Sequence, residues 1–196
     1  AEEAYISTAA SPFSDAMAEK AMELIGENIR RFVANRTDVE AAEAMMVGSL
    51  FAGIAFSFAR LGNVHAMSHP VSAFFDVPHG VANAVLLPVV AEYNALADHG
   101  RYYKIYNYIS EIPAYEDEFE PMMLVDAIRS LCKAIGIPAN LTEAINQAGK
   151  TGSISRETIE EKIEAMAADA MKSGNIAVNP RSSRQCDIEM LYRKAL

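Results

Sequence analysis

The spacing of apolar residues constrains the fold of this chain most strongly, because such residues recur every three to four positions along most of its length. One apolar stripe runs through residues 14–33, and another runs through residues 155–172. No stretch keeps the alternation of apolar and polar residues that marks a half-buried strand. Few glycines (10), no tryptophan and abundant Ala, Met, Leu and Glu favour helix. We therefore predict one all-α domain, residues 1–196, of about seven or eight helices.

Capping and breaking residues mark where the helices begin and end. Ser14 or Asp15 is expected to cap the first long helix. The segment 39–60 is apolar nearly all round, which indicates a central, buried helix; membrane insertion is the less favoured alternative. The predicted helices cover about residues 14–33, 39–60, the segment after Gly62 up to 75, 80–97, 101–109, 122–135, 155–172 and 186–195, with a short turn or helix from 140.

Charge and cysteine content exclude several classes of protein. The formal net charge of −9 over 196 residues argues against a nucleic acid or an anionic membrane as partner. No uninterrupted apolar run approaches the ~20 residues of a membrane span, and the first residues do not resemble a signal peptide. Two cysteines, Cys132 and Cys186, cannot form a disulfide framework. Cys132 is interpreted as a core thiol, and a reducing cytoplasm is expected.

Three of the four histidines fall within fifteen residues of one another. His65 and His69 are four residues apart, so on a helix they share one face. Pro78 and Gly80 interrupt the helical pattern, and His79 stands at the start of the next helix. A chain that doubles back here would bring His79 beside His65. Imidazoles that converge from two elements suit a borderline metal such as Zn²⁺ or Fe²⁺.

The spacing of the histidines allows two other interpretations. Histidines at helical spacing are often only polar residues on a half-buried face. The spacing is also that of the zincin motif, which needs Glu directly after the first histidine as general base. Ala66 occupies that position, so a metalloprotease is excluded.

Several further segments accompany the histidines. Gly62 precedes His65 and His69, and they are followed by the run Pro78-His79-Gly80-Val81-Ala82-Asn83-Ala84, by Leu87-Pro88, and in the tail by Ser173-Gly174-Asn175, Asn179-Pro180-Arg181 and Asp187 to Tyr192. Together these residues resemble the signature and tail of the iron-containing (group III) alcohol dehydrogenases, most closely the lactaldehyde and propanediol oxidoreductase branch. The resemblance implies an all-α, multi-helix C-terminal domain of the dehydroquinate synthase-like architecture.

The first residues resemble the second half of another motif of that family, Asp-x-x-x-His-Ala-x-Glu-x-Tyr, through Ala1, Glu3 and Tyr5. The Asp and His of the motif, both metal ligands in the family, would precede Ala1. We therefore expect this chain to be the C-terminal part of a longer enzyme, with the N-terminal nucleotide-binding domain absent. In agreement, the chain has no Gly-x-Gly-x-x-Gly segment for a dinucleotide.

The resemblance implies NAD- or NADP-dependent interconversion of a small alcohol or diol with its aldehyde or ketone. It makes His65 and His79 ligands of a divalent metal, typically Fe²⁺, with Zn²⁺ also accepted. His69 matches a histidine near the metal that is usually not a ligand. It would orient the nicotinamide or substrate, relay a proton, or orient one of the metal-binding side chains. Phe74 and Phe75 would line an apolar substrate pocket or belong to the core.

The resemblance also implies that the partners are the substrate, the N-terminal domain of the same protein and further copies in a homo-oligomer. The sequence leaves two alternatives open. One is a zinc-dependent relative, such as a glycerol dehydrogenase or a dehydroquinate synthase-like lyase. The other is a non-catalytic helical module that keeps the histidines as structure. The run from Pro78 to Ala84 favours the iron-type enzyme.

Overall fold

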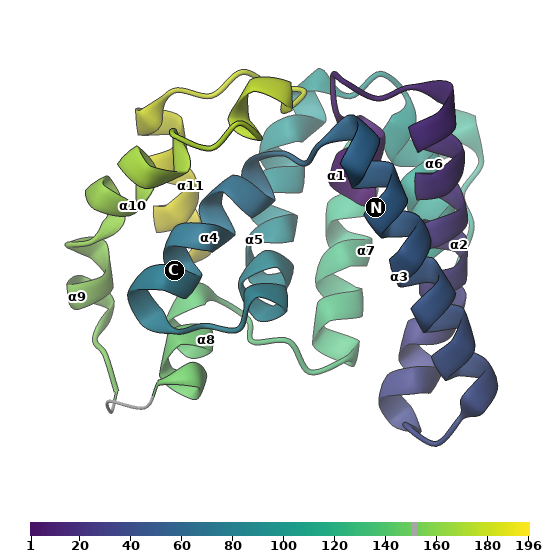
Figure 1. The fold of residues 1–196 in the computed structure, drawn as a ribbon, viewed down its shortest axis with the longest axis horizontal. Coiled ribbons are helices and arrows are strands. Elements are labelled where there is room, and N and C mark those ends of the chain that lie inside the picture. The colour runs from purple at the N-terminus through teal and green to yellow at the C-terminus, as the bar shows by residue number, and fades with distance from the viewer. Residues whose placement is uncertain (150–152) are drawn as a thin grey trace.

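The structure, a computed structural model, describes residues 1–149 and 153–196 and is built from helices throughout that part of the chain (Figure 1). The prediction of an all-α fold is confirmed. The helices are α1 (Glu2–Ile6), α2 (Pro12–Ala34), α3 (Val39–Ala59), α4 (Asn63–Phe75), α5 (His79–Asn94), α6 (Arg101–Ile109), α7 (Pro121–Ala134), α8 (Leu141–Ala148), α9 (Arg156–Glu160), α10 (Ile163–Ala170) and α11 (Gln185–Ala195), with the 3-10 helices η1 (Ala95–Ala97), η2 (Glu116–Glu118) and η3 (Ile176–Val178).

The described residues thus form more helices than the seven or eight predicted. The additional ones are mainly short helices, and one predicted helix is divided into two. The expected helix 155–172 is divided into α9 and α10 by a turn at residues 161–162. Ile159 and Ile163 flank the turn and are both fully buried, so the apolar spacing continues across it. For this reason the sequence pattern gave no sign of the break.

Helix α2 begins earlier than predicted. Ser11 is its N-cap, Pro12 is its first residue, and the Ser11 and Ser14 hydroxyls each accept a hydrogen bond from the other residue's backbone N–H. Prolines suit the first helical position because that N–H has no intrahelical partner. The expected cap at Ser14 or Asp15 is therefore wrong by one turn.

Helix α3 is not the central, buried helix that its composition predicted. It packs against α2 through small side chains, and Ala41, Gly48, Ala55 and Ala59 are its buried residues. The large apolar side chains point outward: Val39, Met46, Val47, Leu50, Phe56 and Phe58 are all exposed. A helix that is apolar all round carries no stripe to show which face is buried, and small residues let two helices approach closely. By length and composition only, α3 and the α5–η1 stretch are long and apolar enough to cross a membrane; this is weak evidence, because core helices of soluble proteins pass the same test.

The core consists of two hydrophobic clusters that meet along α5 (Figure 1). One cluster joins α1, α2, α3, α6 and α7, and the other joins α4, α5, α8, α9, α10 and α11. Ala91 of α5 belongs to the first cluster, and Leu87 packs against both. The middle of α5 therefore lies where the two clusters adjoin.

Pro88 lies inside α5, where a proline removes one backbone hydrogen bond. The carbonyl that loses its partner is that of Ala84, four residues earlier. The thiol of Cys132, on α7, donates to this oxygen at 3.7 Å. Cys132 is only partly buried, and both cysteines are free. The thiol therefore satisfies the carbonyl that the proline leaves without its helical partner.

Candidate metal centre

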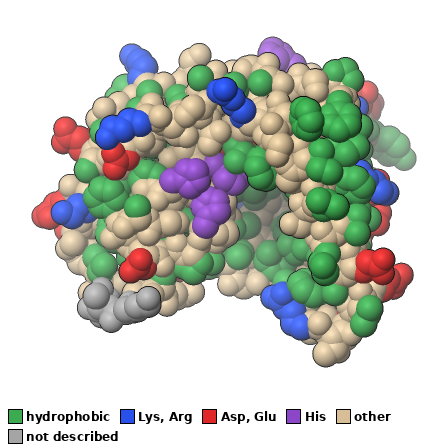
Figure 2. Space-filling view, viewed as in Figure 1, with side chains coloured by type: hydrophobic (Ala, Val, Ile, Leu, Met, Phe, Trp, Pro, Cys, Tyr) green, Lys and Arg blue, Asp and Glu red, His purple; other side chains and the backbone are tan. Residues whose placement is uncertain are grey.

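The three clustered histidines converge at the surface, where α4 and the start of α5 lie side by side (Figure 2). The ring centroids of His65 and His79 are 5.2 Å apart, and those of His65 and His69 are 6.4 Å apart. The rings of His69 and His79 stack at 5.2 Å with an interplanar angle of 20°. The structure therefore brings together all three residues that the sequence singled out, while the fourth histidine, His99, is exposed beside a different cavity.

The start of α4 is held by side chains that are distant in the sequence rather than by a local cap. Its N-cap residue is Gly62, which has no side chain to cap the helix. Instead, Asn179 Oδ1 accepts from the Asn63 N–H at 3.1 Å, and Glu3 Oε1 accepts from the Val64 N–H at 2.7 Å. A Cβ atom on Gly62 would lie 2.8 Å from both of these oxygens. A side chain at this position would therefore displace one or both of these oxygens.

The imidazole of His65 is hydrogen-bonded on both sides. Its Nδ1 is paired with Glu3 Oε2, and its Nε2 accepts from Asn83 Nδ2 at 3.2 Å. Glu3 is 5% exposed, so this carboxylate is removed from water. Buried carboxylates are rare unless paired, and the pairing fixes both the position and the rotation of the imidazole ring.

His79 is held in a similar way, although its side chain is more exposed. Asn83 Nδ2 donates to its Nε2 at 3.0 Å, and its Nδ1 lies 3.4 Å from Ser68 Oγ. Ser68 Oγ donates to the His65 carbonyl at 3.2 Å, so it accepts from the Nδ1–H of His79. The Nε2 atoms of His65 and His79 are thus directed at one point on the first turns of α5.

Burial and the charges of the two neighbouring imidazoles lower the pKa of His79, burial being the larger cause. The ring is therefore neutral at neutral pH. A neutral imidazole has one nitrogen lone pair free to bind a cation. The donor set is two converging nitrogens, one of them backed by a carboxylate, and this set fits a borderline divalent metal.

A cavity of about 330 Å³ adjoins His65 and reaches towards α2. Its apolar walls include Met22, Ile25 and Leu87. Glu2 lines the same cavity, and burial raises the pKa of its carboxyl group to about 8. The suggestion that Phe74 and Phe75 line a pocket does not apply to this cavity: Phe74 is exposed, and Phe75 packs against the core.

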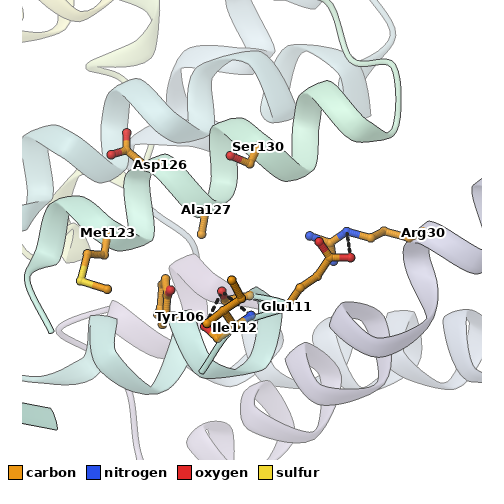
Figure 3. A pocket seen from close by; sticks show the side chains of 9 residues that line it. Arg30, Tyr106, Glu111, Ile112, Met123, Asp126, Ala127 and Ser130 are labelled. Atoms are coloured by element: carbon orange, nitrogen blue, oxygen red, sulfur yellow. Dashed lines mark hydrogen bonds and ion pairs between the residues drawn. The ribbon is translucent and has the colours of Figure 1, made fainter. Parts of the chain in front are cut away.

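Another cavity of about 330 Å³ lies between α2, α6 and α7, and no histidine lines it (Figure 3). Arg30 and Glu111 form an ion pair on one side of it, with Arg30 Nε 3.6 Å from Glu111 Oε1. Its remaining lining residues offer no group of metal ligands. The candidate centre is therefore the histidine cluster and the cavity beside it.

The sequence did not assign a role to Glu3 or to Asn83. Both stand in the segments that resemble family motifs, but nothing local connects Glu3 with His65, because 62 residues separate them. The match of Glu3 to the family motif was the available signal. Within residues 1–149 and 153–196, no three His, Cys, Asp or Glu side chains form a ligand set.

Comparison with known proteins agrees with this geometry. The whole chain, residues 1–196, matches the profile "Fe-containing alcohol dehydrogenase family, C-terminal". The chain belongs to that family and corresponds to the C-terminal domain of its members.

Individual relatives support the same assignment. The chain is 39% identical over 196 residues to a 1,3-propanediol dehydrogenase of Citrobacter freundii, covering 100% of this chain and 48% of that protein. It is 35% identical over 194 residues to the lactaldehyde reductase of Escherichia coli K12, covering 98% of this chain and 47% of the relative. A crystal structure of a 1,3-propanediol oxidoreductase superposes with a TM-score of 0.87 at 38% identity, over 100% of this chain and 48% of the other. The chain thus spans about half the length of these relatives.

Proposed function

We propose that the protein containing this chain is a metal-dependent, NAD- or NADP-linked alcohol dehydrogenase that interconverts small alcohols or diols with aldehydes or ketones. The observation that carries the proposal is the convergence of the His65 and His79 Nε2 atoms in a chain of this family. Several relatives are named as dehydrogenases or reductases of propanediol, butanol, methanol and lactaldehyde, which supports a small substrate, while another is named a long-chain-alcohol dehydrogenase.

In this proposal His65 and His79 are ligands of a divalent metal, Fe²⁺ or Zn²⁺, through their Nε2 atoms. A bound metal supplies Lewis acidity, which favours loss of the alcohol's hydroxyl proton and of hydride to the nicotinamide. Glu3 and Ser68 hold the two rings from their Nδ1 sides. Two nitrogens do not complete a tetrahedral or octahedral set, so further ligands are required, and we propose an Asp and a His upstream of Ala1.

His69 is proposed to contact the nicotinamide or the substrate and to relay the hydroxyl proton. Its ring is exposed and lies against His79 by stacking. Stacked rings share no hydrogen bond. His69 therefore does not orient the lone pair of His79 as a hydrogen-bond partner would. This arrangement favours a role in contact with the reactants over one in support of a ligand.

The nucleotide site is proposed to lie mostly in an N-terminal domain of the same protein, since this chain corresponds to the C-terminal half of its relatives. The choice between NAD and NADP varies among relatives, one being named an NADPH-dependent butanol dehydrogenase and another an NAD-dependent methanol dehydrogenase. We also propose a homo-oligomer that works in the cytoplasm.

The test is His79→Ala in the full-length protein, with His99→Ala as the matched control. Loss of a ligand should remove metal and turnover together, by more than the roughly 10–100-fold that loss of an outer hydrogen-bond partner costs. The variant should stay folded, because the His79 side chain is exposed. Elemental analysis, oxidation of 1,3-propanediol with NAD⁺ or NADP⁺, and circular dichroism measure these outcomes. Normal metal content and turnover in His79→Ala would contradict the assignment.

A further inference from the structure

Glu3 makes two hydrogen bonds to consecutive residues of α4, one with each carboxylate oxygen. Oε1 accepts from the Val64 backbone N–H, and Oε2 is paired with His65 Nδ1. Neither oxygen has a proton to give when the group is ionised, so both neighbours must be donors. With Glu3 ionised, this pairing places the proton of His65 on Nδ1 and leaves the lone pair on Nε2.

Other residues around α4 fit the same tautomer. Asn83 Nδ2 lies 3.2 Å from His65 Nε2, and with the side-chain amide in this orientation it donates to that nitrogen. The Glu3 carboxylate also lies at the N-terminus of a thirteen-residue helix, where the helix dipole favours a negative charge. Gly62 leaves space for the carboxylate, since a Cβ there would lie 2.8 Å from Glu3 Oε1.

We propose that Glu3 is a positioning residue that holds His65 in the Nδ1–H tautomer and aims its Nε2 lone pair at the metal. This inference rests on the proposed function, in which His65 Nε2 is a metal ligand. Glu3 itself binds no metal in this account, because both of its oxygens are already used within the chain. It couples the first helix of the chain to the histidine helix 62 residues later.

The substitution Glu3→Gln distinguishes a role in orienting His65 from a role in supporting the fold alone. Its side chain has nearly the same shape, but one acceptor oxygen is replaced by a donor NH₂. If the amide oxygen keeps the Val64 contact, the NH₂ faces His65 Nδ1 and favours the tautomer protonated on Nε2. Metal binding then requires loss of that hydrogen bond or of the proton.

The experiment compares wild type, Glu3→Gln and Tyr5→Phe in the full-length protein. Tyr5 is on the same short helix, and its hydroxyl donates to Glu19 at 2.7 Å, so Tyr5→Phe also removes one α1 hydrogen bond. Affinity for Fe²⁺ without oxygen, and for Zn²⁺, is measured by chelator competition. Glu3→Gln should weaken both by about 10–100-fold. Tyr5→Phe should leave both unchanged; equal affinities in Glu3→Gln and wild type would overturn the proposal.

Neutron diffraction from metal-free crystals supplies a readout that does not depend on activity. Wild type should show the His65 deuteron on Nδ1, facing Glu3, and Glu3→Gln should show it on Nε2. A wild-type deuteron on Nε2 would overturn the proposal even if Glu3→Gln failed to fold. Glu3→Asp keeps a carboxylate, so it should retain the Nδ1 deuteron.

The two proposals fail in different ways. A wild-type protein that binds neither metal at these histidines contradicts the proposed function, and the tautomer still shows whether Glu3 orients His65. Metal binding that is unchanged by Glu3→Gln contradicts the positioning role alone.

Discussion

Gly26 lies where α2 packs against the end of α6. A Cβ atom there would lie 2.0 Å from the Tyr108 carbonyl oxygen and 2.9 Å from its carbon. Both atoms belong to the backbone, so the helices would have to move apart. Gly26→Ala should lower the free energy of unfolding by about 1–3 kcal/mol, the usual cost of overpacking, as measured by urea denaturation.

Gly53 in α3 is the matched control for Gly26. It is also a glycine within a long helix, but no heavy atom lies within 4 Å of the position of its Cβ. Gly53→Ala should raise stability by up to about 1 kcal/mol, because alanine has the higher helix propensity. Equal effects of the two substitutions would contradict the close approach of α2 and α6.

Glu92 joins α5 to α7 and α11 by accepting hydrogen bonds from Lys194 and from Arg129. The bond from Lys194 is the main cause that lowers the pKa of Glu92 below its ordinary value of 4.5. A lowered pKa stabilises the folded state above pH 4.5, and this contribution is lost as the pH falls through the folded-state pKa. Glu92→Gln should therefore cost about 0.2–1 kcal/mol at pH 7.

The effect of Glu92→Gln should disappear in acid. Urea denaturation of both proteins between pH 7 and pH 3 measures the difference. A difference that grows as the pH falls would show that the carboxylate is not held by the two cations.

Tyr192 docks the last helix, α11, on the histidine helix, α4. Its hydroxyl donates to the Met67 carbonyl at 2.6 Å, and the side chain is fully buried. Met67 lies between His65 and His69, so the contact supports the helix that carries the candidate site. Tyr192→Phe should lower the free energy of unfolding by about 1 kcal/mol, and Tyr115→Phe, at an exposed tyrosine, should not change it. Equal stability of the two variants would contradict the docking role.

Most helix ends could be predicted from the sequence because local chemistry sets them. Asn140 and Ser155 cap α8 and α9 where the sequence predicted helix starts, and α5 begins at His79 directly after Pro78. The orientation of α3 could not be predicted, since its apolar residues surround the whole helix. Its buried face is determined by close packing of small residues against α2, which is a property of two helices together.

Only the local part of the candidate site could be predicted from the sequence. The spacing of His65 and His69 and the turn before His79 are local, and the structure brings the three rings together. The partners of those rings come from elsewhere in the fold. Glu3 reaches His65 across 62 residues, and Asn179 reaches the start of α4 from near the other end of the chain.

For the molecule as a whole, the 196-residue chain spans about half the length of its relatives. It supplies two of the proposed ligands and has no glycine-rich phosphate-binding motif. The isolated chain should therefore fail to oxidise 1,3-propanediol or ethanol with NAD⁺, as followed by NADH absorbance. Turnover by the isolated chain would contradict the proposal that upstream ligands and a nucleotide domain are needed.

The central claim is that His65 and His79 bind one divalent metal through Nε2. Anomalous diffraction at the iron and zinc absorption edges, from crystals of the full-length protein, tests it most directly. We predict a single peak about 2.0–2.2 Å from both Nε2 atoms, with His69 outside bonding distance. A metal bound elsewhere, or one bound through His69 in place of His79, would contradict the account.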